Sequence, residues 1–335
     1  MKDINSQDLA LSVIVPCYNV ERFLDRLLNC LECQWDGRTD YEIILVNDAS
    51  TDRTIDKLNK FKSRFPDHVI VIDKKINEGA GRARNSGLEI ARGKWVVFLD
   101  PDDALKPKSY GRMIELLENA DDDIDILTFG VAIVNEEDWS DSIIGSDFDG
   151  HIDSIISTTD FIVNYQFATC YKYLFNRNLI ANRRFPPLMF LEDVSFVLPV
   201  LLKKLRIAIT KEIVYYYIVR TASATTTVNS ERLSKGCDDI MTAIETLQTL
   251  KEDQDANVQK RIGEHQSFYS INLFTRLLLS NKSIKDITWI RKVLEEMSLY
   301  PLTGHGNKLK LYNYLFRHPV LLSLFRPIYR QIRKR

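Results

Sequence analysis

The chain has 335 residues, 45% of them hydrophobic, which is enough for a sizeable core and more than one domain. Its 45 lysines and arginines nearly balance 46 aspartates and glutamates, so the net charge of −1 argues against non-specific nucleic-acid binding. Charged residues near the start argue against a secretory signal, and no run of about 18 apolar residues could cross a bilayer, so we expect a cytoplasmic protein.

Short apolar runs rich in valine and isoleucine recur through the first part of the chain. Runs of this length are typical of strands buried on both faces. Segments with helical spacing separate the first four runs, and this alternation predicts a mostly parallel sheet flanked by helices. Ligands of such sheets bind at the carboxyl ends of the strands. The predicted strands are residues 11–16, 41–46, 69–72, 95–99 and 124–129.

The pattern changes in the second part of the chain. Residues 130–222 are irregular, with a helix expected at 158–167 and a strand that ends in EIVYYYIV. Three long helical patterns follow, at 231–251, 257–281 and 284–297. We therefore expect the sheet to continue to about residue 222 and a helical appendage to follow it.

Polar residues follow the first two predicted strands. Pro16, Cys17 and Tyr18 end the first, and Asn47 and Asp48 end the second. Asp48 could accept hydrogen bonds from a base or a ribose. Alternatively, Asp48 or the nearby Ser50 caps the following helix. The two interpretations are compatible, because the serine could serve as the cap while the aspartate faces a ligand.

Three carboxylates follow the fourth predicted strand within four residues. Carboxylates this close repel one another unless a positive charge lies between them. Mg²⁺ and Mn²⁺ prefer carboxylate oxygen and commonly take phosphate oxygens as further ligands. In an extended segment Asp100 and Asp102 point the same way, so they could hold one cation, whereas Asp103 would point elsewhere. The alternative is a solvated acidic turn shaped by Pro101.

A glycine-rich segment leads into the third predicted helix. Gly79 and Gly81 begin a G-x-G pattern, but Arg84 stands where a dinucleotide fingerprint needs its third glycine. The segment also follows the third strand instead of the first, which disfavours a dehydrogenase. Arg82 and Arg84 could meet phosphate or a base edge, although a solvated helix face would also explain Arg82.

Two further candidates lie beyond the irregular region. Glu192 and Asp193 open an apolar helix, and an aspartate, ionised at neutral pH, could act as a general base. A helix N-terminal acid stabilised by the dipole is the alternative. Arg220 follows the YYYIV run and could close over a diphosphate, or it could be a solvated loop residue.

Taken in order, four segments resemble the family 2 glycosyltransferases with the GT-A fold, especially bacterial enzymes of capsule, exopolysaccharide and lipopolysaccharide assembly. They are VIVPCYN, VNDASTD, NEGAGRARNSGLEIARGKWVVFLDPDD and FLEDVSF, and the resemblance covers residues 10–225. It implies an inverting transferase that moves a sugar from a nucleotide diphosphate sugar, mostly a UDP-sugar, to an acceptor hydroxyl. It also implies a nucleotide-sugar-binding half at 8–107, an acceptor-side half at 108–225 and a helical C-terminal region at 226–335.

The resemblance assigns roles to individual residues. Asp193 would be the general base. Asp102, together with Asp100, would hold Mn²⁺ or Mg²⁺. The residues implied in donor binding are Pro16, Tyr18, Asp48, Arg84, Asp100 and Arg220. One departure concerns a lysine that many relatives carry before a Leu-Phe or Leu-Tyr pair. Here Tyr173 stands at that place and Lys172 is shifted by one, which would turn the lysine to the other strand face.

The tail from residue 308 to 335 carries eight lysines and arginines and no acid. Such a segment could lie peripherally on an anionic membrane, at the inner face of the cell membrane, which would suit a lipid-linked glycan acceptor. Alternatively, it packs on the domain and its basic end is solvated. Pro319 and Pro327 are expected to break a long helix here.

Two other functions stay open. A nucleotidyltransferase also uses carboxylates and a metal at strand ends, but the chain lacks the early glycine-rich phosphate loop expected of it. A non-catalytic nucleotide-binding subunit of a polysaccharide assembly complex is the other. The presence of Asp100, Asp102 and Asp193 together argues against it.

Overall fold

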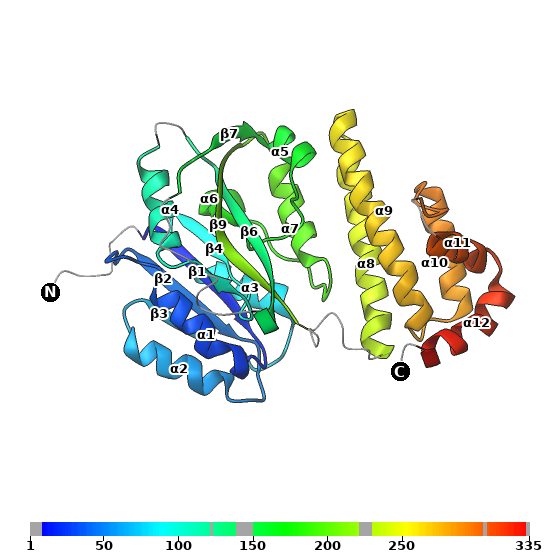
Figure 1. Cartoon of the computed structure of the whole chain (residues 1–335), viewed down its shortest axis with the longest axis horizontal. Helices are drawn as coiled ribbons and strands as arrows, with labels where there is room; N and C mark the ends of the chain where they lie inside the picture. Colours follow the sequence, from blue (N-terminus) through cyan, green and yellow to red (C-terminus); the bar gives the residue numbers. More distant parts are fainter. Residues whose placement is uncertain (1–8, 121–122, 139–149, 221–229, 304–306, 333–335) are drawn as a thin grey trace. The chain divides into compact units, whose positions relative to one another are not determined.

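The computed structural model describes residues 9–120, 123–138, 150–220, 230–303 and 307–332 (Figure 1). The chain forms two compact units. One comprises Met1–Pro187 and Phe196–Ser223, and the other comprises Leu188–Ser195 and Ala224–Arg335. The finer division of the sheet region into donor and acceptor halves at residue 107 stays a prediction.

One mixed sheet forms the centre of the first unit. Its described strands run in the order β3-β2-β1-β4-β8-β6-β9-β5, and β7 pairs with β9. The strands are β1 Leu11–Cys17, β2 Tyr41–Asn47, β3 Val69–Asp73, β4 Trp95–Phe98, β5 Ala104–Leu105, β6 Ile126–Asn135, β7 Ser154–Ser157, β8 Tyr173–Asn176 and β9 Arg206–Val219.

The parallel part of the sheet comes from the first four strands. β1 pairs in parallel with β2 and β4, and β2 pairs in parallel with β3. The other strands make the sheet mixed, because β8 is antiparallel to both β4 and β6 while β6 is parallel to β9. The predicted α/β sheet is therefore confirmed, with its uninterrupted parallel pairing confined to β1 through β4.

Helices cover both faces of the sheet (Figure 1). Leu24, Leu58 and Tyr110 come from three different helices and share one buried cluster with the sheet residues Val13 and Val97. The described helices are α1 Glu21–Glu32, α2 Thr54–Arg64, α3 Ala80–Ile90, α4 Ser109–Glu118, α5 Thr158–Asn164, α6 Arg177–Ile180 and α7 Glu192–Leu201, with a 3₁₀ turn at Glu136–Asp138.

Close packing fixes α3 and α7 on the opposite face. A Cβ atom added to Gly87 of α3 would lie 2.5 Å from Cγ2 of Ile14, so the helix approaches β1 more closely than any larger residue would allow. From α7, the Phe196 ring stacks on Phe185 at 3.9 Å and meets Phe98 of β4 edge-on at 5.7 Å. Both helices are therefore held against strands whose carboxyl ends carry the candidate site.

A buried carboxylate holds the opposite, amino-terminal edge of the sheet. Glu42, 1% exposed, accepts hydrogen bonds from the Ser12 hydroxyl at 2.7 Å and from the Arg92 amide at 2.6 Å. The Arg92 guanidinium also pairs with it at 2.8 Å. The Gly93 amide donates to the same serine at 2.8 Å. This network joins β1, β2 and the turn before β4 far along the strands from the candidate residues.

The second unit is helical. The three predicted helices are confirmed as α8 Ser230–Lys251, α9 Ala256–Leu279 and α10 Ile284–Glu296. α8 and α9 lie side by side as a helical hairpin (Figure 1). Asp255 caps α9, and a Ser283–Asp286 capping box starts α10. Two further helices, α11 Asn307–Arg317 and α12 Pro319–Ile332, complete the unit.

The prolines of the tail act differently from one another. Pro319 is the first residue of α12 and separates it from α11, as expected, because the first helical position needs no amide donor. The prediction that Pro327 ends a helix is wrong, since α12 continues through it. Ser323 and Pro327 are both exposed, so water can satisfy the carbonyl that the proline leaves without an amide.

Two arginines of α12 bind the end of α9. Arg326, 7% exposed, donates to the carbonyls of Ser280 at 2.5 Å and Lys282 at 2.8 Å. Arg330 donates to the Leu278 carbonyl at 3.3 Å.

The described helices include none with the length and hydropathy of a membrane span.

Candidate active site

The carboxyl ends of β1, β2 and β4 lie at one edge of the sheet. In the parallel register Cys17 is opposite Asn47, and Ile14 is opposite Phe98. Backbone bonds continue just beyond the strands, from the Asp48 amide to the Cys17 carbonyl at 2.8 Å. The residues that follow these three strands therefore lie together, as the sequence predicts for a parallel sheet.

Pro16 and Tyr18 differ in exposure. Pro16 is buried within β1 opposite Val46, whereas Tyr18 is 46% exposed. The next residue, Asn19, has a positive φ of 50°, and its side chain accepts a hydrogen bond from the Thr51 amide at 2.8 Å. The loops after β1 and β2 are thereby tied together, and the tyrosine ring is accessible from solvent.

Asp48 is buried and organises the start of α3. Its carboxylate accepts hydrogen bonds from the amides of Gly79 at 2.7 Å and Glu78 at 3.1 Å, and it pairs with Lys74 at 2.5 Å. Gly79 has a φ of 93°, which a larger residue adopts only at a cost. The idea that Asp48 or Ser50 caps α2 is wrong, because Asp52 accepts from the first amide of that helix, Thr54, at 3.0 Å.

Arg84 and Asp100 form a buried ion pair. Arg84 projects from α3, its side chain is 4% exposed, and its Nη2 donates to Oδ1 of Asp100 at 2.8 Å. The guanidinium lies 5.3 Å from the centre of the Phe185 ring. The structure therefore brings together two of the residues predicted to bind the donor, one on a helix and one after β4.

Asp102 is paired with Arg220, although 118 residues separate them in the sequence. The Arg220 guanidinium also lies over the ring of Phe23 in α1, 4.4 Å from its centre. A second arginine, Arg26 of α1, donates to the carbonyl of Asp102 at 2.6 Å. Both carboxylates of the D-x-D pair, Asp100 and Asp102, therefore have a guanidinium partner.

Asp103 differs from this pair in its partners. The prediction of an extended segment here is wrong, because residues 100–103 form a turn in which the Asp103 amide donates to the Asp100 carbonyl at 3.3 Å. Asp103 is 1% exposed, and it accepts from the Tyr215 hydroxyl at 2.6 Å and from the Ile218 amide at 2.9 Å. Burial, followed by the charges of Asp102 and Asp100, raises the pKa of Asp103 to about 8. Its protonated form at neutral pH reduces the repulsion within the acidic triplet.

Aromatic rings line the region around the acidic triplet. The Tyr171 ring stacks on Tyr215 at 4.5 Å between centres and on Tyr217 at 6.2 Å. Burial, and next the charges of Asp100 and Asp103, raises the pKa of Tyr171. The carboxylates and the tyrosines thus share one electrostatic environment.

The ionised form of Asp102 is disfavoured in this environment. Burial and then the charge of Asp100 raise its pKa, while Arg220 acts in the opposite direction. In the residues the structure describes, no three His, Cys, Asp or Glu side chains are arranged to hold a metal alone. Two carboxylates that need positive charge nevertheless fit Mg²⁺ or Mn²⁺, which commonly use one or two protein carboxylates and complete their shell with water and phosphate.

Asp193 belongs to the segment grouped with the second unit. It lies in the first turn of α7, just after Leu191, whose φ of 63° is unusual for a branched residue. Burial, and then the charge of Asp193, raises the pKa of Tyr269 in α9, so the carboxylate acts electrostatically on that ring within the unit. Its predicted role as a base stays a prediction.

Lys172 lies directly before β8 against aromatic rings. Its ammonium is 5.4 Å from the centre of the Phe161 ring and 5.3 Å from that of Tyr173. Burial lowers the pKa of Lys172 to about 8. Tyr173, at the position where many relatives carry the lysine, is fully buried.

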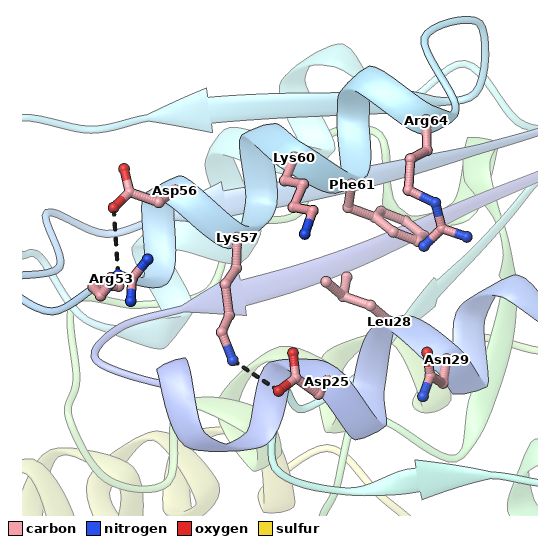
Figure 2. Close-up of a pocket in the computed structure, with 9 residues that line it drawn as sticks. All are labelled: Asp25, Leu28, Asn29, Arg53, Asp56, Lys57, Lys60, Phe61 and Arg64. Atoms are coloured by element: carbon pink, nitrogen blue, oxygen red, sulfur yellow. Dashed lines mark hydrogen bonds and ion pairs between the residues drawn. The ribbon is translucent and has the colours of Figure 1, made fainter.

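A separate cavity of about 410 Å³ lies between α1 and α2 (Figure 2). Lys57 of α2 reaches Asp25 of α1 at 2.9 Å, and Arg53 approaches Asp56 at 4.0 Å (Figure 2). Arg64 pairs with Glu32 at 2.8 Å. None of the residues at the carboxyl edge lines this cavity, and much of its charge is already balanced, so we assign it no part in the site.

Three residues of the site were not foreseen from the sequence. Arg26 and Lys74 reach the site from helix α1 and from the loop after β3, and nothing in their local sequence distinguishes them from solvated cations. Tyr215 had a usable signal. In the strand pattern of EIVYYYIV, alternate residues share a face. Tyr215 and Tyr217 are therefore expected on the same face of the sheet.

Residues 12–179 match the sequence profile of glycosyl transferase family 2. A poly(ribitol-phosphate) beta-glucosyltransferase of Bacillus spizizenii is 29% identical over 217 residues, which are 63% of this chain and 32% of that protein. The chain thus spans about a third or less of the curated relatives it matches first.

Solved structures show the same fold. S. aureus TarS 1–349 in complex with UDP-GlcNAc aligns over 97% of this chain and 92% of its own, with a TM-score of 0.63 and 19% identity. The mannosyltransferase PcManGT from Pyrobaculum calidifontis, in complex with GDP-Man and Mn²⁺, aligns over 96% and 88%, with a TM-score of 0.53 and 14% identity. These structural matches confirm the GT-A fold expected from the sequence. The glycosyltransferase assignment is confirmed by the sequence profile. The profile covers half of the chain, which therefore belongs to glycosyl transferase family 2.

Proposed function

We propose that this protein transfers a sugar from a UDP-sugar to an acceptor hydroxyl, with inversion at the sugar's C1 and with Mn²⁺ or Mg²⁺ as cofactor. The observation that carries the proposal is the pair of carboxylates at the carboxyl edge of β4, each matched with an arginine: Asp100 with Arg84, and Asp102 with Arg220. Guanidinium groups suit a diphosphate because they donate two parallel hydrogen bonds to it.

The donor would lie across the strand ends. Tyr18, which is exposed, and Pro16, which shapes the end of β1, would border the nucleotide. Asp48 would contribute to nucleotide binding partly indirectly, because its carboxylate accepts a hydrogen bond from the Gly79 amide and so positions the loop before α3. Relatives support the choice of donor, since S. aureus TarS was solved with UDP-GlcNAc.

Asp100 and Asp102 would hold the divalent cation. The chemistry it would supply when bound is neutralisation of the charge that develops on the departing diphosphate. A Mn²⁺ ion is named in the structure of the mannosyltransferase PcManGT, which supports the choice of metal. Arg220 lies beside Asp102, and it would donate some of its hydrogen bonds to the diphosphate instead of to that carboxylate.

Asp193 would act as the general base. The acceptor oxygen attacks C1, the bond from C1 to the diphosphate oxygen breaks, and the carboxylate takes the hydroxyl proton. The charge that leaves with UDP would be balanced by Arg84 and Arg220. Its place in the first turn of α7, after the left-handed Leu191, gives the carboxylate a fixed backbone position.

Release of UDP from a panel of UDP-sugars, with Mn²⁺ and without acceptor, tests the proposal. We expect slow release from one sugar, its loss in the Asp102→Asn variant, and its loss on adding EDTA. Activity unchanged by EDTA would contradict the metal assignment. Pyrophosphate release from a nucleoside triphosphate and a sugar phosphate would instead indicate a nucleotidyltransferase, and tight UDP-sugar binding without any turnover would indicate a non-catalytic subunit.

We further propose that the protein works in the cytoplasm at the surface of an anionic membrane, in the assembly of a bacterial surface polysaccharide, on a glycan or lipid-linked glycan acceptor. Four apolar residues of α12 form one row at a spacing of four, and each is well exposed: Val320 74%, Leu324 65%, Ile328 58% and Ile332 65%. Basic residues of α11 are exposed as well: Lys308, Lys310 and Arg317. An apolar row with nearby cations is typical of helices that lie in the interface of anionic membranes.

Flotation with vesicles tests the membrane contact. The protein should float with vesicles that contain phosphatidylglycerol and not with pure phosphatidylcholine. Replacing Leu324 and Ile328 by serine should abolish flotation, whereas serine at Ile133, which is 75% exposed in the other unit, should not. Equal flotation of all three proteins would refute the role of α12.

A further inference from the structure

The second unit contains a cavity of its own, of about 330 Å³. Two arginines, one carboxylate and several aromatic or apolar side chains line it: Met189, Phe190, Leu191, Glu192, Arg232, Ile240, Phe268, Tyr269, Asn272 and Arg276. All of them belong to the second unit, whereas the residues assigned above to the donor lie in the first. None of the residues assigned above to the donor therefore lines this cavity.

The cations of the cavity gather around one ring. The guanidinium of Arg276 lies 4.3 Å from the centre of the Phe190 ring, and that of Arg232 lies 5.9 Å from it. Phe190 is itself fixed, because its ring packs where a Cβ atom on Gly236 would be 2.9 Å away. The preceding Met189 amide donates to Asp239 at 2.8 Å, which holds the loop in place.

The side chains that line the cavity carry more positive than negative charge. Two guanidinium groups face one lining carboxylate, Glu192. Burial, together with the nearby charge of Arg232, lowers the pKa of Arg276. Among the residues that the structure describes, the buried Nε atom of Arg276 has no hydrogen-bond partner. A partly buried guanidinium repelled by a second one is stabilised by an oxyanion that accepts from both.

We propose that this cavity binds a phosphate group of the acceptor, with the adjoining polyol or sugar unit against Phe268 and Tyr269. A forked guanidinium matches phosphate oxygens, and the aromatic walls provide apolar area for carbon-bound hydrogens of a polyol. The volume lies at the small end of ligand pockets, which suits one phosphate with one short polyol and not a whole polymer.

The position of the cavity explains why the ligand belongs to the acceptor. Glu192, which lines it, directly precedes Asp193 in the first turn of α7, and the charge of Asp193 also acts on Tyr269 in the cavity wall. An anion held here would bring its neighbouring hydroxyl group to the proposed base. This step rests on the proposed function, whereas the binding of phosphate does not.

Calorimetric titration of the full chain with sn-glycerol 3-phosphate tests the site, with glycerol as the neutral control. We expect binding of the phosphate ester and none of glycerol. Asn272 is exposed and lines the cavity, so Asn272→Asp adds a negative charge there without disturbing the core. It should weaken binding by about tenfold or more, because the new carboxylate repels the negatively charged phosphate.

A matched control comes from the same helix. Asn257 is exposed at the other end of α9 and does not line the cavity, so Asn257→Asp makes the same change of charge and should leave binding unchanged. Arg276→Gln should weaken binding as Asn272→Asp does, and Arg276→Lys should restore part of it. Equal affinity of wild type, Asn272→Asp and Arg276→Gln would overturn the site, as would no binding by wild type.

UDP-sugar binding, measured on the same samples, separates this inference from the proposed function. Asn272→Asp should bind UDP-sugar like wild type and show a raised KM for a phosphate-bearing acceptor. Phosphate binding without any UDP-sugar binding would preserve the cavity and refute the transferase. UDP release without phosphate binding would support the transferase and refute the phosphate site in the cavity.

Discussion

The carboxylate of Asp48 accepts a 2.7 Å hydrogen bond from the amide of Gly79, and this contact fastens the start of α3 to the end of β2. α3 in turn carries Arg84, whose guanidinium holds Asp100 after β4. A residue predicted to touch the nucleotide therefore also positions, through one helix, the pair proposed to meet the diphosphate.

Replacing Asp48 by alanine should reduce both stability and donor affinity. It leaves Lys74 without its buried carboxylate and the two amides without an acceptor, which should lower the free energy of unfolding by about 3 kcal/mol in urea titrations. As a control, Asp73→Ala removes a more exposed acid paired with Lys75 and should cost less than about 1 kcal/mol. Equal losses would show that the contact with the α3 amides is unimportant.

Asp102→Asn should abolish turnover without loss of stability. Because burial and Asp100 raise the pKa of Asp102, its ionised form destabilises the fold relative to its neutral form, and asparagine resembles the neutral form. We expect an equal or higher melting temperature and a fall in UDP release of about 100-fold or more. A lower melting temperature with normal turnover would contradict both parts.

Asp193→Asn should stop sugar transfer while leaving donor binding intact. Loss of a general base typically costs about 10² to 10⁴ in rate. Calorimetry with a UDP-sugar should give an affinity within about twofold of wild type, since the base acts on the acceptor. Glu245→Gln, an exposed acid of α8, is the control and should transfer normally. Full transfer by the asparagine variant would remove Asp193 from the mechanism.

Lys172→Met should stabilise the protein in a pH-dependent way. The pKa of Lys172 is about 8 in the fold, against about 10.4 for an exposed lysine, so between these values the unfolded chain binds the proton and the folded chain does not. Stability of the wild type therefore rises from pH 8 to about 10.4, and below pH 8 the penalty is fully present.

The Lys172→Met variant lacks this free-energy penalty, because methionine carries no charge. Urea titrations should show a gain on the order of 1 to 3 kcal/mol at pH 7, which shrinks toward pH 10. A gain of the same size at both pH values would indicate better packing of methionine, unrelated to the buried charge.

Gly87→Ala should destabilise the sheet through one contact. The added methyl would lie 2.5 Å from Ile14, so α3 must move away from β1 at a cost of about 1 to 3 kcal/mol. Ile14→Ala removes the clashing atoms and leaves a void of its own. The double variant should then be more stable than the sum of the single effects predicts, and additivity would show that the helix relaxes without the isoleucine.

The sheet could be read from the sequence because short Val and Ile runs in parallel strands are apolar on both faces. The predicted β1 at 11–16 and β2 at 41–46 each extend one residue further in the structure. Later strands were less clear, since β6 and β9 pair across a region of mixed polarity. The continuation of α12 through Pro327 could not be foreseen, because it depends on exposure to water that local sequence does not specify.

The site was predictable where one strand end carried an unusual group of residues. Asp100 and Asp102 were found in this way, but the turn formed by residues 100–103 was not, because an acidic triplet after a strand fits an extended segment equally well. Their partners were harder to find. Arg220 and Asp102 are far apart in the sequence and meet because β5 pairs with β9, and the contact of Asp48 with the Gly79 amide joins two separate loops. Such long-range pairings leave no local pattern.

The arginines of α12 that bind the end of α9 impose a practical limit on protein engineering. Arg326 and Arg330 serve as an external cap for the carbonyls of Leu278, Ser280 and Lys282. A fusion partner or affinity tag that replaces the chain from residue 326 onward would therefore remove the hydrogen bonds that these arginines donate to the end of α9. Any such replacement should leave Arg326 and Arg330 in place.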